Sequence, residues 1–325
     1  MGLSHDPHRL SPAGAETGWR QKYPASRPPP SKGKRTAVKF TFWGTRGSIP
    51  TPSNPQTPTQ EYGGDTTCVS LEWGRDGLLL VDAGTGIRRA GFHWLQSGRK
   101  NFTILFTHAH WDHLQGFPFF APAYLAGNSI EVLSPRLPNR PAGNIIEKAL
   151  YAQQEEPFFP AGFPELRANI TFREVQPGEE LKFSSGKETV RVQSALTRHP
   201  GGCLAYRFDG LGRNGPSSLV FATDNEPPID PRSPLLKMTR GADLLICDGQ
   251  YTEEEHEKRR GWGHGTPSLC LEQTVAAQAK RLLVTHFDPG HSDSQLKKME
   301  DALIAAGQKR GVAATFARQN QEILL

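Results

Sequence analysis

Three histidines and one aspartate stand within six consecutive positions of this chain, in the run His-Ala-His-Trp-Asp-His that begins at His108. On a loop, side chains two positions apart can converge on one point. His108 and His110 can therefore bind one cation, while Asp112 and His113 turn toward a second. Imidazole and carboxylate groups together suit Zn²⁺ or a similar transition ion. The alternative is a polar loop without metal, and this density of the commonest metal ligand argues against it.

Three later residues extend this set. His199, Asp224 and His286 each follow an apolar run, at the point where a buried strand would release a polar side chain into a common rim. Taken singly, each could be a hydrogen-bonded rim residue. Taken in order after the histidine-rich loop, they raise the candidate ligands to seven, which is enough for two metal ions.

This ordered set resembles the HxHxDH motif and the later single ligands of the metallo-β-lactamase superfamily, over the chain from about Val38 to its end. The resemblance implies an α/β (α+β) fold, a four-layer αββα sandwich with the metals at one edge between two sheets. It implies two divalent ions, Zn²⁺ or else Mn²⁺. The implied ligands are His108, His110 and His199 for one ion, Asp112, His113 and His286 for the other, and Asp224 as a bridge between them.

Asp82 follows another apolar run, where the superfamily has a supporting acid. A carboxylate behind the ligands would fix an imidazole or a loop. Aspartate is equally common as a turn residue or helix cap, so both interpretations of Asp82 stay open.

Two features indicate a branch of the superfamily. Asp224 stands where many antibiotic-hydrolysing members have cysteine, and the histidine-rich motif differs from that of the flavodiiron redox branch. The run Gly261-Trp262-Gly263-His264-Gly265-Thr266 is similar to the His-Ser/Thr motif of the tRNase Z and phosphodiesterase branch. The resemblance implies that His264 contacts the scissile phosphate and protonates the leaving oxygen, a role that needs a pKa near neutrality. A histidine in a glycine-rich turn with no such role is the alternative.

The first glycine-rich segment is a weaker pointer to phosphate. Residues 42–50, followed by Tyr-Gly-Gly-Asp-Thr-Thr at 62–67, resemble bacterial phosphodiesterase-like members of this branch. Arg46 or Ser48 could contact a phosphate there, and Thr266 is a further candidate. A purely structural strand-to-loop turn is the alternative.

These residues together predict a dinuclear metal-dependent hydrolase that cleaves a small or cyclic phosphodiester through a metal-bridging hydroxide. Asp112 would orient the hydroxide and His264 would protonate the departing alkoxide. The alternatives are a tRNase Z-like ribonuclease, an ester, thioester or lactone hydrolase on the same fold, and a non-catalytic metal-binding protein.

Strands and helices must position these groups. Apolar patterns predict a hairpin from 67–73 and 78–81, and helices at 86–95, 145–153, 268–280 and 294–306. Strands alternate with the last two helices, as layered α/β folds require. Further strands are predicted at 38–43, 102–106, 130–133, 170–175, 190–192, 203–208, 218–222, 244–247 and 282–284.

The composition and the charge distribution limit the class and the domain organisation of the chain. The chain has 325 residues, with 36% hydrophobic and 22% charged residues, which excludes wholesale disorder. The net charge of +5 comes from the first 35 residues, which hold seven basic and two acidic side chains. We therefore predict a disordered basic, proline-rich tail at 1–36 and a formally neutral catalytic domain at 37–325, with RNA less favoured than a small substrate.

Four scattered cysteines and the lack of an apolar span or signal peptide predict a soluble cytoplasmic protein. The resemblance allows a homodimer, which no feature of the sequence decides.

Overall fold

The computed structural model describes residues 38–137, 143–210, 212, 217–228 and 230–325. The predicted tail at 1–36 lies outside these residues, so the division at residue 37 stays a prediction. Within the described residues the strands form two seven-stranded sheets, in the orders β14-β1-β2-β3-β4-β5-β6 and β13-β12-β11-β10-β9-β8-β7. The strands are β1 (Lys39–Gly44), β2 (Cys68–Trp73), β3 (Gly77–Val81), β4 (Asn101–Leu105), β5 (Ser129–Pro135), β6 (Asn169–Val175), β7 (Glu180–Ser185), β8 (Glu188–Leu196), β9 (Leu204–Asp209), β10 (Ser218–Ala222), β11 (Leu244–Asp248), β12 (Arg281–Thr285), β13 (Ala313–Phe316) and β14 (Glu322–Leu324).

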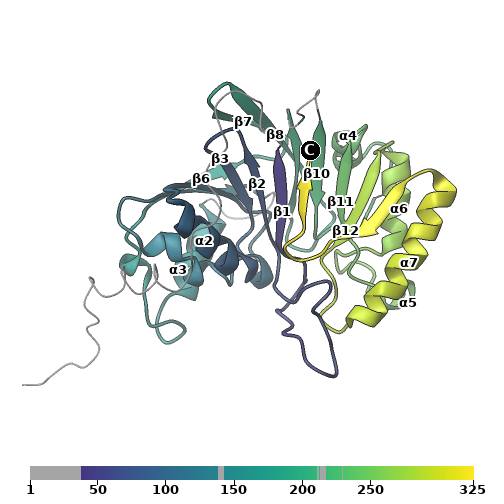
Figure 1. Ribbon diagram of the computed structural model, residues 1–325, viewed down its shortest axis with the longest axis horizontal. Coiled ribbons are helices and arrows are strands. Elements are labelled where there is room, and N and C mark those ends of the chain that lie inside the picture. The colour runs from purple at the N-terminus through teal and green to yellow at the C-terminus, as the bar shows by residue number, and fades with distance from the viewer. Residues whose placement is uncertain (1–37, 138–142, 211, 213–216, 229) are drawn as a thin grey trace, which may run out of the picture.

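Helices cover the outer face of each sheet, so the predicted four-layer αββα sandwich is confirmed (Figure 1). Helices α2 and α3 pack on the first sheet, and α4, α6 and α7 pack on the second. The helices are α2 (Gly86–Ser97), α3 (Ile145–Gln153), α4 (Pro234–Thr239), α5 (Glu253–Lys258), α6 (Pro267–Ala276) and α7 (Asp293–Arg310), with short 3₁₀ turns η1 (Trp111–His113), η2 (Phe117–Phe119), η3 (Ala121–Tyr124) and η4 (Phe163–Glu165).

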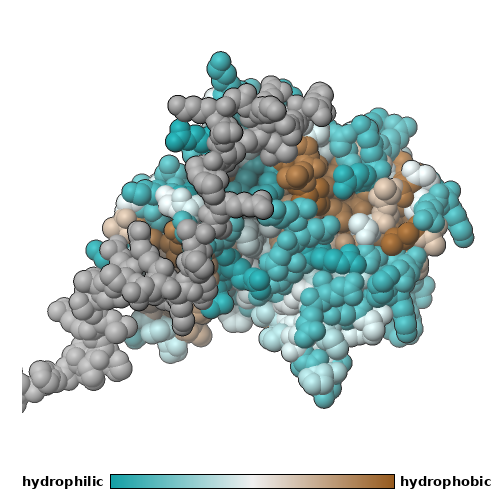
Figure 2. Space-filling view, viewed as in Figure 1, coloured by the Kyte–Doolittle hydropathy of each residue, from teal (hydrophilic) through white to brown (hydrophobic). Residues whose placement is uncertain are grey.

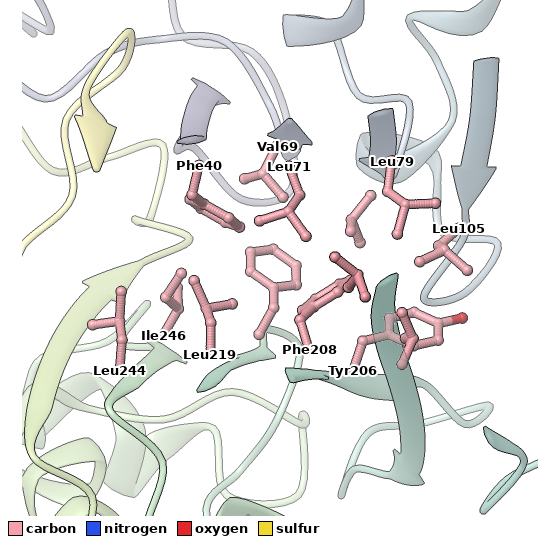
Figure 3. Packing of buried hydrophobic residues seen from close by; sticks show 14 of the residues in the cluster. Phe40, Val69, Leu71, Leu79, Leu105, Tyr206, Phe208, Leu219, Leu244 and Ile246 are labelled. Atoms are coloured by element: carbon pink, nitrogen blue, oxygen red, sulfur yellow. The ribbon is translucent and has the colours of Figure 1, made fainter. Parts of the chain in front are cut away.

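The central core lies between the two sheets. Figure 3 shows apolar side chains of the first sheet facing those of the second across this layer. Two further cores fill the space between each sheet and its helices. On the face seen in Figure 2, hydrophilic residues predominate and hydrophobic ones are confined to small areas. The labelled residues of Figure 3 are Phe40, Val69, Leu71, Leu79 and Leu105 on one side and Tyr206, Phe208, Leu219, Leu244 and Ile246 on the other.

Burial along the strands explains which of them the sequence predicted. Strands β3, β10 and β11 are buried at every position, and the continuous apolar runs that this requires are easy to recognise. Edge strand β7 alternates between exposed and buried residues, and the short strands β13 and β14 carry mixed residues. These three strands were not predicted.

The last strand lies beside the first. β14 pairs antiparallel with β1, with Leu324 opposite Lys39, and the backbone N–H of Leu325 donates to the carbonyl oxygen of Val38 at 2.9 Å. The two ends of the described fold are therefore neighbours in the first sheet.

The direction of the strands sets the place of the site. β3 runs parallel to β4 in the first sheet, and β10, β11 and β12 run parallel in the second. The carboxyl ends of parallel strands meet at one edge of a sheet. Residues that follow these five strands are therefore brought together at one edge of the sandwich.

Glu300 of α7 anchors this helix to the second sheet. Its buried carboxylate accepts hydrogen bonds from the Tyr62 hydroxyl at 2.7 Å, the Phe316 backbone N–H at 3.0 Å and the Arg318 guanidinium at 2.9 Å. Burial acts to raise the pKa of Glu300, but the bonds from Arg318, Thr315 and Tyr62 outweigh it and lower the pKa to about 2.

We expect Glu300→Gln to lower the free energy of unfolding by roughly 2 kcal/mol at neutral pH, because a buried carboxylate partner is lost. Since the folded-state pKa is depressed, the contribution of Glu300 is full above its ordinary pKa of 4.5 and is lost as the pH falls toward about 2. Urea titrations of metal-free, chelator-treated protein between pH 7 and pH 3 measure the free energy of unfolding of both proteins. The exposed Glu254→Gln is the control, and an equal difference between wild type and E300Q at every pH would contradict the assignment.

In the part of the chain that the structure describes, no helix combines the length and the apolar character needed to cross a bilayer.

Candidate metal centre

The seven predicted ligands gather into two adjoining clusters. The ligand atoms within each cluster all lie within 4.8 Å of one another. The histidine-rich loop after β4 contributes to both clusters, and the ends of β8, β10 and β12 supply the rest. The first cluster is His108, His110 and His199, and the second is Asp112, His113, Asp224 and His286.

Asp224 lies between the two clusters. Its Oδ1 is 3.7 Å from His108 Nε2 and 3.9 Å from His199 Nε2, on the side of the first cluster. Its Oδ2 is 3.1 Å from His113 Nε2 and 3.3 Å from His286 Nε2, on the side of the second. One carboxylate thus offers one oxygen to each cluster, which is the geometry that a bridging ligand needs.

Acceptors behind the clusters fix the orientation of the imidazoles. His113 Nδ1 donates to Asp82 Oδ2 at 2.8 Å, and His199 Nδ1 donates to the Gly263 carbonyl at 3.2 Å. His286 Nδ1 donates to Gln250 Oε1 at 3.1 Å. Each of these contacts makes Nδ1 the donor and directs Nε2 toward the clusters, as in metal-binding histidines.

Asp82 also fixes the start of the histidine-rich loop. Its Oδ1 accepts from the backbone N–H of Thr107 at 2.8 Å. Of the two interpretations that the sequence left open, these contacts favour support of the histidine-rich loop over a simple turn cap.

The donor set fits divalent cations. His113 Nε2 and His286 Nε2 lie 3.3 Å apart, and His199 Nε2 lies 2.9 Å from His110 Nδ1. The buried Nε2 of His108 has no hydrogen-bond partner among the described residues. Lone pairs that face one another in this way repel unless a cation or a proton lies between them. Imidazole nitrogens with carboxylate oxygens are the ligands that Zn²⁺ takes in proteins.

The electrostatics of the two clusters differ. Burial lowers the pKa of His199 to about 4 and that of His108 well below its usual range, so these imidazoles are neutral. Burial also acts to lower the pKa of His286, but the carboxylates of Asp224 and Asp248 outweigh it and raise that pKa to about 9. The carboxylates thus create a negative potential at the second cluster, which favours a cation there.

Backbone strain is concentrated at this site. Among the described residues, six non-glycine residues have positive φ, and four of them belong to the site: Ser48 at 63°, Asp82 at 62°, Asp224 at 54° and His286 at 64°. The left-handed region costs about 1–3 kcal/mol for such residues and persists only where the surrounding structure enforces it. Here it lets the chain turn sharply at the strand ends and direct the side chains inward.

His264 lies beside the second cluster. Its ring stacks on that of His286, with centroids 5.2 Å apart, and Nδ1 donates to Asp248 Oδ2 at 2.7 Å. This bond leaves Nε2 of His264 as the group with which the ring can act. The ligand atoms of Asp224, Asp248, His264 and His286 also lie within 4.8 Å of one another, so His264 could alternatively ligate a cation.

The sequence did not predict three supporting residues: Asp248, Gln250 and Glu226. Glu226 accepts from the Gly261 backbone N–H at 2.9 Å and so holds the loop that carries His264. Asp248 is the last residue of β11, directly after an apolar run, which is the signal that identified Asp224 and His286. Applied to every predicted strand, that signal would have found Asp248, whereas nothing local marks Gln250 or Glu226.

The structure corrects two predicted substrate contacts. The fully buried Arg46 guanidinium donates to the carbonyl oxygens of Gly63 at 3.0 Å, Asp288 at 2.9 Å and His291 at 2.8 Å. The buried hydroxyl of Thr266 accepts from the Leu269 N–H at 3.2 Å and caps α6. Both side chains serve the fold and neither is exposed to a substrate.

Ser48 is exposed at the rim of the site, and its contact with substrate stays a prediction. Its backbone N–H donates to Asp112 Oδ2 at 2.8 Å, so this turn also fixes the position of Asp112.

Comparisons with known proteins show what this chain is similar to. A family model described as the β-lactamase superfamily domain matches residues 78–287. The ribonuclease Z of Halobacterium salinarum is 23% identical over 284 residues, which span 77% of this chain and 86% of that protein.

Two solved structures share the fold. The metallo-β-lactamase fold protein YhfI from Bacillus subtilis matches with a TM-score of 0.62 at 17% identity, covering 89% of this chain and 99% of that one. A diphosphatase from the PhnP family matches with a TM-score of 0.59 at 18% identity, covering 89% of this chain and 98% of that one. At these identities the structural matches establish the fold alone.

Proposed function

This chain belongs to the β-lactamase superfamily, and from that premise we propose that it is a metal-dependent phosphodiesterase acting on a small or cyclic phosphodiester. The observation that carries the proposal is the bond between His264 and Asp248 beside the second cluster. A hydrolase of carboxylic esters, thioesters or lactones needs no such histidine. A diesterase needs an acid for its leaving oxygen.

Two divalent ions, Zn²⁺ or Mn²⁺, would be held by the two clusters, with Asp224 as the shared ligand. When bound, they would supply a hydroxide nucleophile at neutral pH and stabilise the charge that develops on the phosphoryl oxygens. The proposed ligands are His108, His110 and His199 for one ion and Asp112, His113 and His286 for the other.

The residues around the clusters have separate tasks. Asp112 Oδ2, held by the Ser48 N–H, would accept a hydrogen bond from the attacking water and orient it toward phosphorus. His264 would carry a proton on Nε2 and give it to the departing alkoxide oxygen. Asp248 keeps the other ring nitrogen protonated and the ring in place, and stabilises the imidazolium form before the proton leaves.

RNA is the second candidate substrate. The H. salinarum relative is a ribonuclease Z and matches 77% of this chain. A 3′ end of RNA presents the same phosphodiester as a small substrate does.

A substrate panel tests the proposal. Protein reconstituted with Zn²⁺ or with Mn²⁺ is assayed on bis-p-nitrophenyl phosphate, cyclic nucleotides, a 3′-extended tRNA, a thioester and a lactone. Diester turnover well above that of the thioester and lactone is expected. Negligible turnover of every diester with both metals would overturn the proposal, and a strong preference for the tRNA would move it to the second candidate.

Gly47 offers a test of the proposed metal ligands. A Cβ at this position would lie 2.4 Å from the Cε1 and Nδ1 atoms of His286, so the ring must shift. We expect Gly47→Ala to weaken metal binding about 10–100-fold, as loss of ligand orientation does in metal sites. Competition with a chromophoric chelator measures this.

The control for Gly47 is Gly162→Ala, where the added Cβ makes only an ordinary contact of 3.4 Å with Pro164. Unchanged metal affinity in G47A would remove His286 from the ligand set.

A further inference from the structure

Exposed apolar side chains adjoin the metal centre. Seven large hydrophobic side chains are exposed among the described residues, and three of them are direct sequence neighbours of site residues. Trp111 is 72% exposed and stands between His110 and Asp112. Trp262 is 59% exposed and precedes Gly263, and Ile49 is 57% exposed and follows Ser48. Exposed apolar side chains beside a polar site offer contacts to an apolar part of a ligand.

The two tryptophans are sequence neighbours of His110 and of a residue that His199 contacts. Trp111 directly follows His110, and Trp262 directly precedes Gly263, whose carbonyl accepts from His199 Nδ1 at 3.2 Å. His110 and His199 are themselves in contact, with Nδ1 and Nε2 2.9 Å apart. Both indoles therefore project from backbone that adjoins the solvent-exposed side of the first cluster.

Hydrogen bonds hold the backbone of both residues. The Trp111 carbonyl accepts from the N–H groups of Leu114 and Gln115, at 3.1 and 2.8 Å. The Trp262 N–H donates to the Arg259 carbonyl at 3.0 Å, and Glu226 holds the preceding Gly261. Two exposed indoles on fixed backbone provide stacking surfaces that lose little conformational entropy when a ring binds.

Arg46 offers the substrate no charged contact. The Arg46 guanidinium is buried and bonded to carbonyl groups, and residues 36–325 are formally neutral. Base stacking on aromatic side chains is a common form of recognition beyond the phosphate.

We propose that Trp111 and Trp262 bind the nucleobase of a small nucleotide phosphodiester by stacking, so that the substrate class is nucleotide diesters and not alkyl diesters. This inference rests on the proposed phosphodiesterase function. It adds a specificity-determining contact at the side of the first cluster.

Binding of two monophosphates tests the proposal without relying on turnover. Adenosine 5′-monophosphate and ribose 5-phosphate differ only in the base, and isothermal titration of metal-loaded protein measures both. We expect wild type to bind the first about 5–100-fold more tightly, which is the range of stacking on one aromatic residue. Trp111→Leu and Trp262→Leu should each reduce that preference, and Trp111→Phe and Trp262→Phe should retain much of it.

Leu324→Ala is the matched control, since Leu324 is 67% exposed and pairs with Lys39 at the end of β1 away from the site. Equal affinity of wild type for the two ligands, or an unchanged preference in both leucine variants, would overturn the stacking proposal. Bis-p-nitrophenyl phosphate turnover of the same preparations separates the two failures. If diesters are turned over without a base preference, only the stacking proposal is contradicted. If none of the diesters is turned over, the phosphodiesterase function itself is contradicted.

Discussion

Replacing His264 by alanine is expected to lower kcat about 10²–10⁴-fold on a nucleotide diester with an alkoxide leaving group, which is the range that general acid catalysis contributes. The protein should keep its bound metal, because His264 belongs to neither of the two proposed ligand sets. The loss should be much smaller on bis-p-nitrophenyl phosphate, since p-nitrophenolate is a weak base that leaves without a proton. Steady-state kinetics on both substrates, with metal content by mass spectrometry, measure this.

The two substrates and the metal content distinguish the alternatives for His264. An equal loss on both substrates would contradict a leaving-group acid. Loss of metal would show that His264 acts as a ligand with Asp224, Asp248 and His286, whose ligand atoms all lie within 4.8 Å of its own. Asp248→Asn is the companion variant. It should also lower turnover of the nucleotide diester strongly, because an asparagine amide can donate to Nδ1 of His264 and leave the ring in the wrong tautomer.

Replacing Asp224 by asparagine is expected to remove at least one of two bound metal ions and to lower turnover by more than about a thousandfold. The change keeps the shape of the side chain and removes only its charge. Asp224 contacts His108 and His199 through one oxygen and His113 and His286 through the other, so its loss affects both clusters. Metal analysis after equilibration against excess Zn²⁺ measures the stoichiometry.

The matched control for Asp224 is Asp243→Asn. Asp243 stands just before β11, at the opposite end of the second sheet, where it pairs with the exposed Lys280. This variant should keep full metal content and turnover. Two tightly bound ions in D224N would contradict the bridging role of Asp224.

The sequence predicted which side chains gather into the two clusters, because the signal of these residues is local. The histidine-rich run is contiguous, and Asp224 and His286 each follow an apolar run that ends a buried strand. Prediction failed where side-chain direction depends on tertiary contacts. Arg46 lies in a glycine-rich turn that suggests phosphate binding, yet its guanidinium turns inward to three carbonyl groups that are far away in sequence or across a loop. The same limit explains why Gln250 and Glu226 were not predicted.

The two ends of the described fold lie side by side in the first sheet, so the chain could be joined there and opened at another turn. The backbone of Leu325 is bonded to that of Val38, so a short linker could join them without distorting β1 or β14. At Gly186, in the turn between β7 and β8, an added Cβ would meet nothing within 4 Å, so a new chain start there would disturb little packing. Such a circular permutant keeps every strand neighbour in both sheets, and with them the edge where His113, Asp224 and His286 meet. The site thus depends on which strands lie side by side and not on the order in which the backbone connects them.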